Sequence, residues 1–240
     1  MNNEKSNGKI KLFCIPYAGG NASIFFKFRD YLDRFIDLIP IELPGRGRRM
    51  KEELCNNFEQ LSEDVFQSIL HQINGTEYAI LGHSLGGLLA LDAAVRLERS
   101  RYNNIRYLFV SGVCPPQLKN MEESICDLSD QDFLNEIIKL GGMSLEFLEN
   151  DDLVKTFLPI LKSDYRIYES YKANIVEKIS VNCDITAFIG KEDEKTDEID
   201  VSKWNQYTER NFSLYVFVGN HFFINTNYKE VCRVINNLLV

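Results

Sequence analysis

Several features are missing from this 240-residue chain, and each absence excludes a class of protein. No apolar run is long enough to cross a bilayer, and the polar segment 1–11 has no apolar signal core. The six cysteines, at positions 14, 55, 114, 126, 183 and 232, are irregularly spaced and form no C-x-x-C pair. We therefore expect a cytoplasmic protein without a membrane partner, whose reduced thiols pack as small core residues and bind no metal.

The chain also lacks an excess of positive charge. Lys and Arg number 27 against 35 Asp and Glu, which gives a formal net charge of -8. Because nucleic-acid binding needs a basic face, this balance disfavours nucleic acid as the main partner. Internal repeats, low-complexity tracts and linkers are absent as well, and the length suits one domain over residues 1–240.

Strand-like and helix-like segments alternate along most of the sequence. The predicted strands are 9–15, 36–43, a short apolar run from 79, 105–113, 184–189 and 213–218. The predicted helices between them are 22–35, 58–73, 84–98, 201–207 and 228–239. This alternation predicts an α/β fold with a mostly parallel central sheet and helices on both faces.

The segment from about 115 to 180 breaks this alternation, because it contains helical patterns and no convincing strand. One helix is expected to begin after an N-cap at Ser129, and two more are expected over 151–161 and 163–171. So long a detour between strands is typical of a functional insertion. We interpret it as a helical lid.

The stretch Gly82-His83-Ser84-Leu85-Gly86 has the form G-x-S-x-G, with an apolar run before it and a helical pattern after it. That context is the one that a nucleophile elbow requires. The two glycines remove side chains that would clash in a tight strand-to-helix turn. The sequence therefore predicts that Ser84 is a nucleophile.

A serine nucleophile needs a base, and the base needs an orienting acid. Among the three histidines, His221 follows a strand downstream of Ser84, which is the chain order of the α/β-hydrolase arrangement. His71 lies in a helical pattern, and the ring of His83 is expected to point away from the serine. We therefore predict that His221 is the base.

The acid is expected on the loop that follows the strand 184–189. Asp193 is the preferred residue there, with Glu192 and Asp197 as alternatives. A tetrahedral intermediate also needs two N–H donors. We expect one from Leu85 and the other from Tyr17 or Ala18.

Seven ordered segments carry a resemblance to a known family. They are P-Y-A-G-G at 16–20, L-P-G-R-G-R-R at 43–49, G-H-S-L-G-G at 82–87, L-S-D-Q-D-F and G-G-M within 128–143, L-P-I-L-K-S-D-Y at 158–165, G-K-E-D at 190–193 with Trp204, and G-N-H-F-F-I at 219–224. In this order they resemble the type II thioesterases, the stand-alone thioesterases of nonribosomal peptide and polyketide synthases. The sequence departs from the family pattern at Lys162, commonly arginine, and at Leu85, often methionine.

The resemblance implies an α/β-hydrolase fold and hydrolysis of acyl groups from the phosphopantetheine arm of acyl or peptidyl carrier proteins. It implies Ser84, Asp193 and His221 as the triad, without a cofactor, in an enzyme that we expect to be a monomer. Two rival functions remain: a carboxylesterase or lipase acting on small free esters, and a non-catalytic binding protein with a hydrolase fold.

Two further sets of residues receive roles on this interpretation. The basic loop is expected to contact an acidic carrier protein or the pantetheine phosphate, or else to be a solvated charge run; its residues are Arg46, Arg48, Arg49 and Lys51. The lid is expected to line an acyl chamber, or else only to pack on the core, through Met143, Phe147, Leu148 and Phe157.

Overall fold

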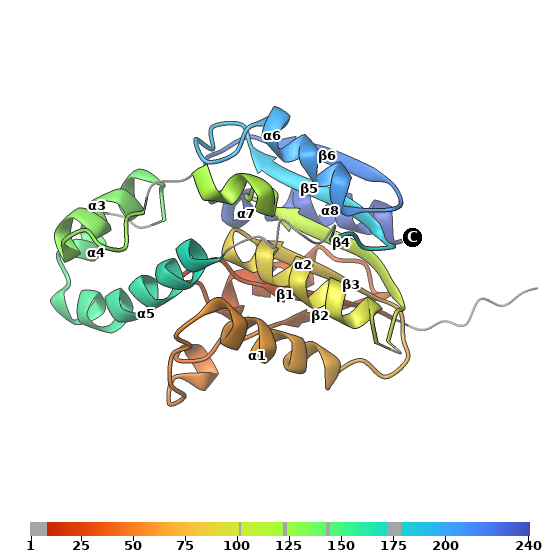
Figure 1. Ribbon diagram of the computed structural model, residues 1–240, viewed down its shortest axis with the longest axis horizontal. Helices are drawn as coiled ribbons and strands as arrows, with labels where there is room; N and C mark the ends of the chain where they lie inside the picture. The colour runs from red at the N-terminus through yellow and green to blue at the C-terminus, as the bar shows by residue number, and fades with distance from the viewer. Residues whose placement is uncertain (1–8, 101, 122–123, 143–144, 172–178) are drawn as a thin grey trace, which may run out of the picture.

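The computed structural model describes residues 9–100, 102–121, 124–142, 145–171 and 179–240 (Figure 1). Within these residues six strands form one sheet in the order β2-β1-β3-β4-β5-β6, and every neighbouring pair is parallel. The strands are β1 (Ile10–Ile15), β2 (Ile36–Pro40), β3 (Tyr78–His83), β4 (Ile105–Ser111), β5 (Asp184–Gly190) and β6 (Phe212–Phe217). The predicted α/β architecture with a parallel sheet is confirmed.

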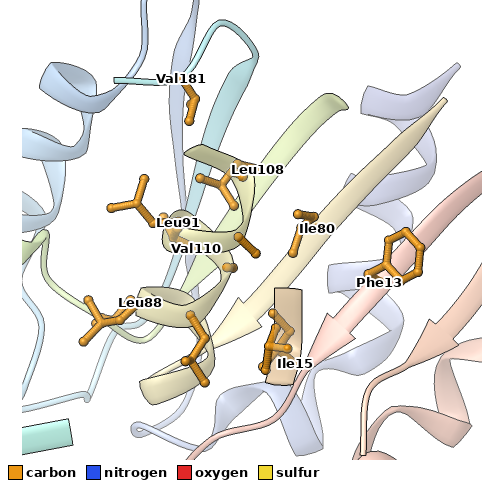
Figure 2. Close-up of a cluster of buried hydrophobic side chains, with 14 of the residues drawn as sticks. Phe13, Ile15, Ile80, Leu88, Leu91, Leu108, Val110 and Val181 are labelled. Atoms are coloured by element: carbon orange, nitrogen blue, oxygen red, sulfur yellow. The ribbon is translucent and has the colours of Figure 1, made fainter. Parts of the chain in front are cut away.

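Successive side chains of the central strands point to opposite faces of the sheet, and an apolar core lies on each face. Tyr78 and Ile80 of β3 pack in the core beneath α1 (Phe58–Leu70) and α2 (Leu85–Glu98). Figure 2 shows Ile80 of β3 in the same cluster as Leu88 and Leu91 of α2.

The opposite face carries the second core. Ala79 and Leu81 of β3 pack there against η1 (Ala22–Asp30) and α8 (Tyr228–Leu239). Since β3 is buried along its whole length, its sequence is apolar on both faces, as expected of a central parallel strand.

The insertion between β4 and β5 is helical. It contains η3 (Pro116–Met121), α3 (Asp130–Lys139), α4 (Leu145–Leu148) and α5 (Asp151–Ser170). In Figure 1, α3 and α4 lie to one side of the sheet, and α5 runs from them back to the core. Ser129 caps α3 by accepting a hydrogen bond from the N–H of Asp132, as the sequence predicts.

The remaining short elements are η2 (Gly47–Arg49), α6 (Glu198–Ser202), η4 (Lys203–Tyr207) and α7 (Phe223–Thr226). None of the described helices is long and apolar enough to span a membrane.

Several predicted helices differ from those observed. The helix expected over 22–35 is a 3₁₀ helix that ends at Asp30. Its buried anchors, Phe25 and Phe28, are three residues apart, which suits the three-residue turn of this helix type. The two helices expected over 151–161 and 163–171 form one continuous helix, α5, because its buried residues on both sides of position 162 hold it against the rest of the protein.

The turn from β3 to α2 leaves no room for side chains. A Cβ atom placed on Gly82 would lie 1.9 Å from the carbonyl oxygen of Gly86. A Cβ atom on Gly86 would lie 2.3 Å from the carbonyl oxygen of Ile15, at the end of β1. The first turn of α2 therefore packs against the ends of β1 and β3 through backbone contacts.

This packing predicts that Gly82→Ala destabilises the protein severely. The new methyl group meets backbone atoms that cannot move without shifting α2, so we expect a loss of more than about 4 kcal/mol in the free energy of unfolding. Gly75→Ala is the matched control, because it has φ +82° but no atom within 4 Å of the added Cβ. It should cost only the backbone strain, about 1–2 kcal/mol. Urea unfolding measures both variants, and equal midpoints for the two would contradict the packing argument.

Candidate active site

Three loops at the carboxyl edge of the sheet bring the predicted site residues together. Ser84 follows β3, Asp193 follows β5 and His221 follows β6. Ligands bind at this edge in open parallel sheets. Ser84 and His221 line one narrow cleft of about 40 Å³. In the described ranges, no three His, Cys, Asp or Glu side chains gather in a way that could hold a metal ion.

Ser84 has a strained backbone conformation. Its φ of 54° and ψ of -120° make it the one non-glycine residue with positive φ in the part of the chain that the structure describes. Its N–H donates to the carbonyl oxygen of Ser111 at 2.7 Å, and its own carbonyl accepts from the N–H of Gly87 at 2.8 Å. Such strain persists only where the surrounding structure enforces it. These contacts hold the Ser84 side chain in the cleft.

His221 is held by a buried carboxylate. Its Nδ1 lies 2.9 Å from Oδ2 of Asp193, whose side chain is fully buried. Burial by itself raises the pKa of Asp193, but hydrogen bonds and charge attraction from His221, with further bonds from Lys195 and Thr196, outweigh it and lower the pKa. The carboxylate therefore stays ionised at neutral pH and fixes Nδ1 as the protonated nitrogen, which leaves Nε2 as the acceptor.

The other two candidate acids have different partners. The carboxylate of Glu192 accepts a hydrogen bond from the N–H of Gly219. Asp197 caps α6 by accepting from the N–H of Asp200 at 2.9 Å. Neither contacts the imidazole of His221 through a hydrogen bond, so the geometry favours Asp193.

Thr196 is a site residue that sequence reasoning missed. Its hydroxyl donates to Oδ2 of Asp193 at 2.9 Å, and the N–H of Lys195 donates to Oδ1 at the same distance. Together with His221 these donors fix both carboxylate oxygens. The only available signal was that Thr196 follows Asp193 by three residues, the spacing of a turn.

The loop after β1 supplies the second expected N–H donor. Residues 17–20 form a turn in which the N–H of Gly20 donates to the carbonyl oxygen of Tyr17 at 2.9 Å. Gly19 has φ +77° at the third position of this turn, which requires glycine. Ala18 lines the cleft with Ser84 and His221. The ring of Tyr17 packs instead edge-to-face on His83, with ring centroids 5.6 Å apart.

Ala18 and Leu85 each present a free backbone donor. Within the described residues, no acceptor is hydrogen-bonded to either N–H. Leu85 is the first residue of α2, where the helix has no internal acceptor for its N–H and the helix dipole favours negative charge. Because Ala18 lines the cleft and Tyr17 does not, the geometry favours Ala18 over Tyr17 as the partner donor.

The ring of His83 packs against the ring of His221. The two ring centroids are 5.2 Å apart, and Nδ1 of His83 lies 2.8 Å from Oγ of Ser111. Burial, followed by repulsion from His221, lowers the pKa of His83 well below its ordinary value. His83 is therefore a neutral packing residue.

A larger cavity adjoins the cleft beneath the lid. Its volume is about 280 Å³, and it shares Ala18 and Tyr165 with the cleft. Of the predicted chamber residues, Phe147 and Phe157 line this cavity. Leu148 packs instead on the apolar cluster inside the lid, and Met143 lies outside the described residues.

The three arginines of the basic loop have different environments, and the burial of Arg46 corrects the expectation that this residue lies at the surface. Arg46 is only 4% exposed and forms a bidentate ion pair with Asp164 of α5. Arg49 is bidentate with Asp64 of α1, with both contacts at 2.7 Å. The guanidinium group of Arg46 is buried against a buried carboxylate, so it is not presented to a partner. Arg49 is partly exposed and is already paired with Asp64 and Glu52. Arg48 is exposed.

Comparison with known proteins agrees with this geometry. Residues 10–239 match the thioesterase domain family. The gramicidin S biosynthesis protein GrsT of Aneurinibacillus migulanus is 35% identical over 222 residues, which are 92% of this chain and 86% of GrsT. The crystal structure of ClbQ, from the colibactin nonribosomal peptide and polyketide pathway, has a TM-score of 0.91 and 33% identity, with 97% of each chain covered.

A second solved structure is similar over almost the same span. YbtT, a type II thioesterase from the yersiniabactin pathway, has a TM-score of 0.85 and 26% identity, covering 96% of this chain and 93% of YbtT. The family match extends over nearly the whole chain, and it coincides with a serine elbow and a His–Asp pair at one sheet edge. The chain therefore belongs to the thioesterase family and is an α/β-hydrolase enzyme of the type II thioesterase class.

Proposed function

We propose that this enzyme hydrolyses acyl thioesters on the phosphopantetheine arm of carrier proteins, with Ser84 as nucleophile, His221 as base and Asp193 as orienting acid. The observation that carries the proposal is the His221–Asp193 pair at 2.9 Å, which opens onto the same cleft as the strained Ser84. The similarity to proteins of peptide and polyketide pathways supports the choice of carrier protein.

The first half of the reaction transfers the acyl group to Ser84. Nε2 of His221 takes the hydroxyl proton as Oγ of Ser84 attacks the thioester carbonyl carbon. The N–H groups of Leu85 and Ala18 stabilise the resulting oxyanion. When the intermediate collapses, the C–S bond breaks, the pantetheine thiol leaves with the proton from His221, and an ester remains on Ser84.

The second half releases the acid. Nε2 of His221 takes a proton from a water molecule, whose oxygen attacks the ester carbonyl carbon. The same two N–H groups bind the oxyanion. Collapse breaks the bond to Oγ of Ser84, which recovers its proton from His221. Asp193 remains ionised throughout and stabilises the imidazolium that forms in each half.

The cavity beneath the lid is the proposed site of the acyl chain. Its volume of about 280 Å³ is close to the lower limit of small-ligand pockets, about 300 Å³. Its walls include Phe147, Phe157 and Leu161 from the lid and Ile24 from η1, which suit an aliphatic chain. It joins the cleft at Ala18, so an acyl chain in the cavity places its carbonyl carbon near Ser84.

Substitutions at the candidate triad test the mechanism. Asp193→Asn should lower kcat about 10⁴-fold, because an amide favours the wrong tautomer of His221. Glu192→Gln and Asp197→Asn are matched controls on the same loop and should keep kcat within a few-fold of the original enzyme. Steady-state hydrolysis of acyl-carrier protein measures all three, with Ser84→Ala as the inactive reference. A larger loss in either control than in Asp193→Asn would reassign the acid.

The substrate class is tested by turnover of three acyl donors with the same acyl group: a carrier protein, coenzyme A and a simple alkyl ester. The proposal requires the highest kcat/KM on the carrier protein. A preference for the alkyl ester would favour an esterase. No turnover, together with failure of Ser84 to react with a fluorophosphonate, would favour a binding protein.

The acyl chamber predicts a size-dependent effect of Phe157→Trp. The larger ring occupies cavity volume, so kcat/KM for an octanoyl-carrier protein should fall about tenfold while that for an acetyl-carrier protein stays unchanged. Phe157→Leu is the control and should not favour the short chain. Equal losses on both acyl chains for Phe157→Trp would place the chain elsewhere.

Carrier-protein docking is proposed at the exposed cations of the basic loop, Arg48 and Lys51. Reversing both charges with Arg48→Glu and Lys51→Glu should raise KM for acyl-carrier protein about tenfold and spare acyl-N-acetylcysteamine, because the small thioester lacks the acidic partner. The salt dependence of KM should weaken in parallel. Equal effects on both substrates, or no effect, would remove this surface from the proposal.

A further inference from the structure

The carboxylate of Asp164 connects the lid helix to the loop that carries Ala18. Asp164 is 1% exposed, although it belongs to α5, a helix of the lid. Its Oδ2 accepts the N–H of Gly19 at 2.6 Å. Both of its oxygens also accept from the guanidinium group of Arg46, with Oδ1 at 2.8 Å from Nη2.

A second contact from α5 falls on the same glycine. A Cβ atom on Gly19 would lie 2.3 Å from Cδ2 of Leu161, one turn before Asp164 on the helix. Gly19 is thus covered by an apolar side chain and bonded to a carboxylate from the same helix. Its neighbour Ala18 has the N–H that we propose as the second oxyanion donor. Two residues of α5 therefore contact the residue next to that donor.

Arg46 contacts the same turn as Asp164. Its Nε donates to the carbonyl oxygen of Pro44 at 3.2 Å, and Nη1 also reaches the carbonyl oxygen of Gly20 at 3.4 Å. The guanidinium group therefore contacts the same turn, residues 17–20, that Asp164 contacts through Gly19. A buried ion pair is a poor source of stability, because desolvation offsets most of the attraction. Its placement against residues 17–20 indicates that the ion pair positions this turn.

We propose that Asp164, held by Arg46, is a positioning residue that fixes the oxyanion-binding loop through the N–H of Gly19. The proposal rests on the proposed function, because it assigns a role to Ala18 in that reaction. On this view α5 has two functions: it covers the acyl cavity, and it holds a catalytic donor in place.

The first test is Asp164→Asn in the full-length enzyme. The amide has one acceptor oxygen and no charge. With that oxygen in the place of Oδ2, Arg46 loses its bond from Nη2 and its ionic partner; with it in the place of Oδ1, Gly19 loses its acceptor. Because both halves of the reaction pass through an oxyanion, kcat should fall about 10- to 100-fold while KM changes less than twofold. Ser163→Ala is the matched control. Ser163 anchors α5 to the core through the carbonyl oxygen of Cys55 at 2.9 Å and has no hydrogen bond to residues 17–20 among those described. Its kcat should stay close to that of the original enzyme.

Inhibitor affinity separates positioning from general damage. An acyl-chain trifluoromethyl ketone forms a hemiketal with Ser84 whose oxyanion needs both N–H donors, whereas a thioether analogue of the acyl-pantetheine binds without an oxyanion. Asp164→Asn should weaken the ketone about 10- to 100-fold and leave the affinity of the thioether unchanged. Equal weakening of both inhibitors would indicate only a structural role.

A double variant keeps the proposal testable if the single variant folds poorly. Arg46→Met combined with Asp164→Leu replaces the buried charges by apolar groups of similar volume, which in other proteins is neutral or stabilising. The urea midpoint should then match the original enzyme while kcat stays about 10- to 100-fold low, since Gly19 still lacks its acceptor. Recovery of kcat together with stability would overturn the proposal.

The controls distinguish failure of this inference from failure of the proposed function. If the original enzyme hydrolyses acyl-carrier protein and Ser84→Ala does not, the function stands. An unchanged kcat in the double variant Arg46→Met with Asp164→Leu, which has no acceptor for Gly19 at position 164, would then reject the positioning role alone. If Ser84→Ala retains activity, the assigned mechanism fails, and the positioning role fails with it.

Discussion

The contact between the backbones of Gly82 and Gly86 is the constraint on which the site depends. Because neither residue has a side chain, the first turn of α2 fits against the ends of β1 and β3, and the residue between them, Ser84, is forced to φ 54°. The same contact directs the N-terminus of α2 at the cleft, where Leu85 has a free N–H. The strained conformation of Ser84 and the free N–H of Leu85 are therefore two consequences of one packing arrangement.

The lid is attached firmly at one end and packed on itself at the other. The C-terminal part of α5 belongs to the main core: Ile167 is 1% exposed there, and Tyr171, just beyond the helix, packs on Phe58 of α1 with ring centroids 4.3 Å apart. The outer part has its own apolar cluster, which includes Phe133 and Ile137 of α3. The cavity of about 280 Å³ lies where these parts and the loop after β1 meet, so its shape depends on packing contacts from both.

The sequence predicted most of the sheet and its helices because their signals are local. Apolar runs bounded by glycine and proline marked the strands, and the capping pattern at Ser129 placed the start of α3. The predictions failed where spacing alone was ambiguous. Phe25 and Phe28 fit an α-helix and a 3₁₀ helix equally well. The two helices predicted over 151–161 and 163–171 are one helix in the structure, and the polar Asp164 near their junction is buried by its ion pair.

By itself the sequence determined the kind of chemistry: a serine between two glycines, a histidine after a later strand and an acidic loop between them. Tertiary structure decided which groups meet at the cleft and which are engaged elsewhere. It selected Asp193 over Glu192 by placing its carboxylate on His221, and it turned Arg46 from an expected surface cation into the buried partner of Asp164. Such assignments depend on residues far apart in the chain, 118 positions in the case of Arg46 and Asp164. No local pattern encodes which distant charges meet, because that is fixed only when the helices pack on the sheet.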